Sequence, residues 1–145
     1  MSLFNVLSIN ASGMAAQRAR AELLVENMAN ADTTRTPDGG PYRRKDVVFE
    51  SRPVDSPFAS VFQALAGGGA TGVAVSQVVV DQREPEMRYL PGHPDADADG
   101  YVAFPRVNPA EDMVDLMNAT RSYQANVSAM TAIKDMIQRS IDLLR

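Results

Sequence analysis

The residues best suited to chemistry form an acidic turn of Asp95, Asp97 and Asp99, followed by Gly100. Alternating aspartates before a glycine are the first half of a calcium-binding loop, in which carboxylate oxygens hold the ion. The last position of such a loop needs a glutamate, but Arg106 stands there and would repel calcium. The pattern therefore favours a solvated turn leading into a strand, with a small calcium-binding module as the alternative from a different class.

Other catalytic and metal-binding patterns are missing from the sequence. There is no cysteine and a single histidine, which excludes thiolate metal sites, disulfides and a two-histidine site within one chain. His93 lies in a proline-rich turn, and no nucleophile elbow accompanies it. The glycine-rich stretch 67–72 lacks the lysine that ends a phosphate-binding loop. We expect no enzymatic activity, no cofactor, no metal and no small-molecule substrate.

Composition narrows the class further. The 145 residues carry 14 basic and 18 acidic side chains, a net charge of −4, which argues against nucleic-acid binding. The apolar fraction of 45% is typical of a globular chain of about one domain. No segment has the ~20 apolar residues of a membrane span, and the N-terminus does not resemble a secretory signal peptide. We expect a protein that stays in the cytoplasm or leaves it without a cleaved signal.

The two ends of the chain have helical periodicity. Residues 1–32 carry an apolar stripe with further apolar residues beside it, which predicts a helix with more than one packing partner. The residues expected to pack from this helix are Phe4, Leu7, Ile9, Met14, Leu23, Leu24 and Met28.

The C-terminal helix is predicted from Asn108, an N-cap candidate followed by Pro109 and by Glu111 at the capping-box position. Its seam repeats every seven residues, which favours a left-handed coiled coil. The first row comprises Leu116, Tyr123, Met130, Ile137 and Leu144, and the second Met113, Thr120, Val127, Lys134 and Ile141. The apolar members of both rows and Thr120 are the candidate assembly seam.

The sequence of the middle of the chain predicts a small β-rich insertion. Turn formers surround short β-like runs at 47–50, 73–80, 87–90 and 101–104, whereas 58–65 could form a helical turn or two before the flexible loop 67–72. The expected fold is α+β, with an antiparallel coiled-coil pair of terminal helices. Residues 1–32 and 108–145 form the helical core domain, and residues 33–107 form the insertion.

Periodicity alone leaves two interpretations of the seam, an ordinary two-helix core or an assembly surface. The apolar area that one helix pair buries contributes little free energy compared with the entropy cost of ordering both helices. This imbalance favours packing against neighbouring molecules.

Residues 25–33 resemble the A-N-N-L-A-N-x-x-T pattern of bacterial flagellar axial proteins, through Asn27, Ala29, Asn30 and Thr33. Asn27 and Asn30 carry short amides that can bond backbone groups where the helix stops. Residues 41–49 closely resemble a P-Y-R-x-K-x-V-x-F stretch of the FlgC family of basal-body rod proteins, and residues 91–102 and 121–126 are similar to later parts of that family. The matching positions are Pro41, Tyr42, Arg43, Lys45, Tyr101, Ser122, Gln124 and Asn126.

The resemblance implies a structural subunit of the proximal rod, the drive shaft that carries motor torque across the periplasm to the hook and filament. It implies export through the flagellar type III apparatus and helical assembly with copies of itself and with FlgB, FlgF and FliE. The paired terminal helices would form the inner tube that lines the export channel, and the middle segment an outer layer. A different rod subunit of the same family is the nearest alternative, and a cytoplasmic coiled-coil adaptor is a more distant one.

Overall fold

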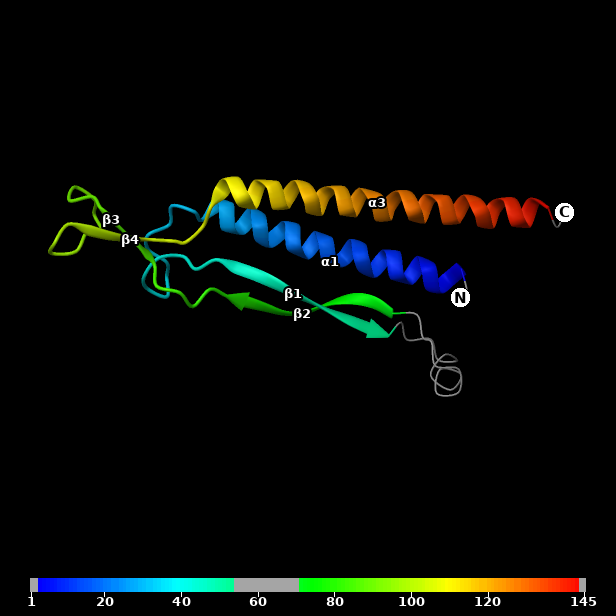
Figure 1. Cartoon of the computed structure of the whole chain (residues 1–145), viewed down its shortest axis with the longest axis horizontal. Helices are drawn as coiled ribbons and strands as arrows, with labels where there is room; N and C mark the ends of the chain where they lie inside the picture. The colour runs from blue at the N-terminus through cyan, green and yellow to red at the C-terminus, as the bar shows by residue number, and fades with distance from the viewer. Residues whose placement is uncertain (1–2, 54–70, 144–145) are drawn as a thin grey trace. The chain divides into compact units, whose positions relative to one another are not determined.

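The computed structural model describes residues 3–53 and 71–143 (Figure 1). It is an α+β fold with two long terminal helices and short antiparallel strands between them, as predicted. In chain order the elements are α1 (Leu3–Ala29), β1 (Lys45–Pro53), β2 (Thr71–Val80), β3 (Glu86–Tyr89), β4 (Tyr101–Phe104) and α3 (Pro109–Asp142). The expected helical turns at 58–65 and most of the expected loop 67–72 lie outside the described residues.

Side chains at the helix ends explain where the helices start and stop. The Oδ1 atom of Asn108 accepts a hydrogen bond of 3.2 Å from the backbone N–H of Ala110, which confirms the predicted N-cap of α3. At the end of α1, the backbone N–H of Asn30 donates to the carbonyl oxygens of both Glu26 and Asn27. The chain leaves the helix through a turn at residues 30–32, and the backbone N–H of Tyr42 donates to the Thr33 carbonyl oxygen at 3.0 Å.

The strands form two ribbons, β1 with β2 and β3 with β4. In the antiparallel β3–β4 hairpin, Tyr89 lies opposite Tyr101, and Val102 is buried. Gly100 precedes β4 with a φ of +83°, and a Cβ atom there would lie 2.9 Å from the Tyr89 ring. Only glycine fits both constraints, so the acidic turn closes tightly before the strand, as expected.

The chain divides into two compact units, and the division crosses both helices and the β1–β2 ribbon. One unit contains residues 1–19, 49–76 and 119–145. Within it α1 and α3 approach closely, because a Cβ atom on Gly13 would lie 2.9 Å from Nδ2 of Asn126. Ala16, Ala119 and Ile133 are buried in this unit. The small side chains of the two alanines allow the two backbones to come together.

The other unit contains residues 20–48 and 77–118. Here the same two helices are antiparallel partners, with an ion pair of 3.4 Å between Arg20 and Asp115. Its core combines apolar and polar side chains from α1, the segment before β1, β4 and the first turn of α3. The buried members are Leu24, Asn27, Tyr42, Val102, Phe104, Pro105 and Asp112.

Candidate functional site: the junction around Asn27

Asn27 is the centre of a buried polar junction between α1 and the start of β1. Its side chain is 0% exposed. Its Nδ2 donates to the Lys45 carbonyl at 2.8 Å, and its Oδ1 accepts from the Lys45 backbone N–H at 2.9 Å. The amide therefore pairs with Lys45 as a neighbouring strand would, and fixes the register of the first strand against the helix.

Tyr42 completes this junction from the segment before β1. Its hydroxyl donates to Oδ1 of Asn27 at 2.9 Å, and its ring is buried. Burial, reinforced by the Glu26 and Asp112 carboxylates, raises the pKa of Tyr42 to about 12. The phenol therefore stays neutral at physiological pH and acts as a fixed hydrogen-bond donor.

Two ion pairs flank the junction. Lys45 pairs with Glu26 at 2.5 Å, and its ammonium lies 5.7 Å from the centre of the Tyr42 ring. Arg44 donates to Asp112 at 2.7 Å, although Asp112 is only 1% exposed. Burial raises the pKa of the Asp112 carboxyl, and the Arg44 guanidinium opposes that shift. The second pair thus joins the segment before β1 to the first turn of α3.

The raised pKa of Tyr42 predicts a loss of stability between about pH 10 and 12. The phenol ionises near pH 10 in the unfolded chain but near pH 12 in the folded one, so the folded state binds more protons in this range. Stability is therefore complete below pH 10, and about 2–3 kcal/mol is lost as the pH rises through 12. Urea unfolding at several pH values measures this, and Tyr42→Phe should give a flatter profile. An equally steep profile in that variant would contradict the assignment.

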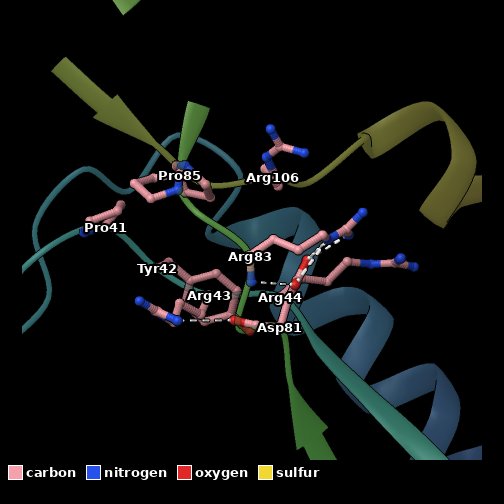
Figure 2. A pocket seen from close by; sticks show the side chains of 9 residues that line it. Pro41, Tyr42, Arg43, Arg44, Asp81, Arg83, Pro85 and Arg106 are labelled. Atoms are coloured by element: carbon pink, nitrogen blue, oxygen red, sulfur yellow. Dashed lines mark hydrogen bonds and ion pairs between the residues drawn. The ribbon is translucent and has the colours of Figure 1, made fainter. Parts of the chain in front are cut away.

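A small pocket lies next to the junction (Figure 2). Its volume is about 40 Å³, and its lining consists of Pro41, Tyr42, Arg43, Arg44, Asp81, Arg83, Pro85, Pro105 and Arg106. Asp81 is the single acidic residue in this lining. Bonds from Arg83 hold the pKa of Asp81 down to about 2, so its carboxylate is charged and engaged internally. The pocket is predominantly basic.

The structure brings several of the residues of the flagellar resemblance together at the junction. Asn27, Tyr42 and Lys45 bond one another, and Thr33 donates to Asn30 at 3.2 Å. Asn30 also bonds the Glu26 carbonyl, which is the predicted helix-end role of its amide.

The remaining motif residues lie elsewhere. Pro41 and Arg43 line the pocket. The Tyr101 ring lies edge to face with the Tyr89 ring, with 5.3 Å between the ring centres. Ala29, Ser122 and Gln124 are exposed, whereas Asn126 is half-buried beside Gly13.

The first predicted row of the α3 seam lies at or near the intrachain contact. Leu116, Met130 and Ile137 are half-buried, and Tyr123 is 40% exposed. Leu144 lies outside the described residues. On the N-terminal helix, Leu24 is buried and Leu7, Ile9, Met14, Leu23 and Met28 are half-buried. The side chain of Phe4 is not among those described.

The second predicted row is exposed in the single chain, at Met113, Thr120, Val127 and Ile141. The row that packs within the chain lies one position earlier in each heptad, at Asp112, Ala119, Asn126 and Ile133. An aspartate, an alanine and an asparagine give no hydrophobic signal, so periodicity missed this row. Its members share the seven-residue spacing of the two predicted rows, and no other feature of the sequence marks them. The assembly role of the exposed row stays a prediction.

The three carboxylates of the acidic turn do not converge. Asp95 accepts from the Thr34 hydroxyl at 2.8 Å, and Asp97 accepts from the backbone N–H groups of Asp99 and Tyr101. Across residues 3–53 and 71–143, no group of three histidine, cysteine or acidic side chains is placed to hold a metal ion. These hydrogen bonds support the interpretation of a turn that leads into a strand.

Comparison with known proteins defines the class of this chain. Residues 98–143 match the family described as flagellar basal body rod FlgEFG protein C-terminal. That region comprises the end of the acidic turn, β4 and α3. This part of the chain is therefore similar to the C-terminal part of flagellar rod proteins.

Full-length relatives narrow the class to one family. Flagellar basal-body rod protein FlgC of Borreliella burgdorferi is 37% identical, over 100% of this chain and 99% of the relative. The FlgC proteins of Bacillus subtilis and Salmonella typhimurium are 39% and 41% identical, each over 99% of this chain and 99% and 98% of the relatives.

The chain belongs to the FlgC family. It is a structural subunit of the proximal rod of the flagellar basal body, and not an enzyme. None of its described helices is long and apolar enough to cross a membrane.

Proposed function

We propose that the chain assembles helically with copies of itself and with FlgB, FlgF and FliE in a rod that crosses the periplasm. The rod transmits motor torque to the hook and filament and lines the export channel. The chain reaches its place through the flagellar type III export apparatus. Residues 1–32 and 108–145 act as the helical core domain, and residues 33–107 as the insertion that meets adjacent subunits.

The observation that carries this proposal is the exposed apolar row of α3. Met113 is 58% exposed and Val127 is 41% exposed, although both stand on a helix whose other face already packs within the chain. Val114 and Met117 extend the exposed apolar surface. A helix that is apolar on two sides has two packing partners, so neighbouring rod subunits cover the second side.

Torque transmission needs subunits that do not shear internally. The Asn27 junction supplies this by fixing the backbone at Lys45 to α1 through two hydrogen bonds. The Arg44–Asp112 pair fixes the same segment to α3. Close-packed elements transmit strain rather than absorb it. Within the unit that contains residues 20–48 and 77–118, these contacts hold the start of β1 to both helices.

Placing a charge on the exposed row tests the proposal. Val127→Asp leaves the intrachain contact untouched but adds a carboxylate to the surface that neighbours cover. We expect an unchanged circular dichroism spectrum, loss of the chain from purified basal bodies and loss of swimming. The matched control is Ala132→Asp, which adds the same charge at another exposed position on α3 and should assemble normally. Normal motility of the Val127 variant would contradict the proposal.

A further inference from the structure

We infer a head-to-tail contact between copies of this chain, in which the arginine pocket of one copy binds the Asp99 carboxylate of the next. The inference rests on the proposed assembly with copies of itself and names one contact within it. It follows from a basic surface and an acidic surface of the same unit. Each has one exposed charged side chain, Arg106 and Asp99, that makes no hydrogen bond or ion pair within the described residues.

The basic surface is the pocket of Figure 2. Four arginines line it against one aspartate, and Asp81 is already bonded to Arg83. Arg106 is exposed and makes no hydrogen bond or ion pair with any residue that the structure describes. Arg44 pairs with Asp112, and Arg43 donates to the Asp81 carbonyl oxygen and to Gln82. The pocket thus offers one free guanidinium, that of Arg106, within a lining of net positive charge.

The size of the pocket indicates what it accepts. About 40 Å³ is enough room for one carboxylate. Guanidinium groups bind carboxylates through short, charge-assisted and often bidentate hydrogen bonds. The chemistry and the volume together favour a single acidic side chain delivered by a protein.

The acidic surface is the turn before β4. Asp95 and Asp97 are engaged by hydrogen bonds within the unit, but the exposed Asp99 side chain makes no hydrogen bond or ion pair within the described part of the chain. Beside it Tyr89 and Tyr101 are 63% and 44% exposed and stack edge to face. Exposed tyrosines next to an unpaired charge are typical of interface centres.

The two surfaces carry opposite charges. Asp99 supplies the carboxylate, and the two tyrosine rings can lie on the prolines that wall the pocket, Pro41, Pro85 and Pro105. Because the surfaces are different patches of identical chains, their contact leaves one of each unoccupied at the two ends. Such a heterologous contact propagates into a ring or a helical array, which is the geometry that a rod requires.

Disulfide trapping tests the contact directly. The sequence has no cysteine, so Asp99→Cys combined with Arg106→Cys introduces the only thiols. Oxidation of purified basal bodies should produce a ladder of dimers, trimers and longer species of this chain on a denaturing gel. Either single substitution, and Asp38→Cys combined with Arg106→Cys, should give no ladder. Basal bodies that contain the double variant but yield only monomer would overturn the inference and leave the proposed function intact.

Charge exchange gives an independent readout. Arg106→Asp and Asp99→Arg should each reduce the amount of assembled chain by about tenfold or more, as expected for a lost charge-assisted contact. Combining both substitutions in one chain restores complementary charges and should restore assembly and swimming. Arg106→Lys and Asp99→Glu keep the charges and should retain most assembly. A double variant as defective as the single ones would contradict the proposed pairing. The same result is expected if another rod protein occupies the pocket.

Discussion

Replacing Asn27 by leucine is expected to lower the free energy of unfolding by about 3–5 kcal/mol, although the two side chains are similar in size. The change removes three hydrogen bonds and leaves the Tyr42 hydroxyl and both backbone groups of Lys45 without their partner. Each buried polar group left unpaired costs about 1–3 kcal/mol. The start of β1 should then detach from α1, with loss of assembly as the consequence in the cell.

Urea unfolding of the purified chain measures this effect, and hydrogen exchange at the Lys45 amide locates it. The matched control is Asn30→Leu, one turn further along the same chain. Asn30 is only half-buried, and its bonds stay within the helix end, so its replacement should cost about 1 kcal/mol. Equal losses for the two variants would show that Asn27 is no more than another helix-end asparagine.

Asp112→Leu is expected to destabilise the chain by about 2–4 kcal/mol, because it leaves the Arg44 guanidinium largely buried with only its longer, solvent-exposed ion pair to Asp46 at 3.6 Å. The double variant Arg44→Met with Asp112→Leu removes both charges and should recover most of the loss. An isolated buried charge is costly, whereas an apolar pair of similar volume is nearly neutral.

The control for this pair is the more exposed ion pair between Arg20 and Asp115. Asp115→Leu removes one partner in the same helix–helix contact, but solvent reaches the arginine that remains, so the expected cost is below about 1 kcal/mol. Thermal unfolding of the unchanged chain, Asp112→Leu, the double variant and Asp115→Leu distinguishes the buried ion pair from the exposed one. Failure of the double variant to recover stability would mean that Arg44 and Asp112 act through other contacts.

Local patterns in the sequence were sufficient to predict the elements. The cap at Asn108, the long helical periodicity and the short runs between turn formers each depend on neighbours a few residues away, and the two helices and four strands of the described residues follow these patterns. The turn at Gly100 was predicted for the same reason, since a positive φ favours glycine wherever it occurs.

Contacts between distant segments were not predictable in the same way. Asn27 was expected to bond the end of its own helix, but its partners are Tyr42 and Lys45, 15 and 18 residues away. The buried row of α3 contains Asp112, whose burial depends on Arg44 from another segment. A polar residue becomes a core residue only when the fold brings it a partner, and a single sequence does not display that partner.

The difference between the predictable local elements and the unpredicted long-range contacts bears on how this subunit works. The side chains that hold one chain together are largely polar or small at the junction and along the buried row, whereas larger apolar side chains such as Met113 and Val127 remain on the surface. Specific hydrogen bonds therefore set the shape of the subunit, and non-directional apolar packing remains for assembly.

Electron cryo-microscopy of purified basal-body rods at side-chain resolution tests the central claim most directly. We predict density for this chain in the rod wall, with Met113 and Val127 covered by neighbouring subunits and Asn27 still bonded to Lys45. Rods that lack this chain, or contain it with that row of α3 facing solvent, would contradict the account.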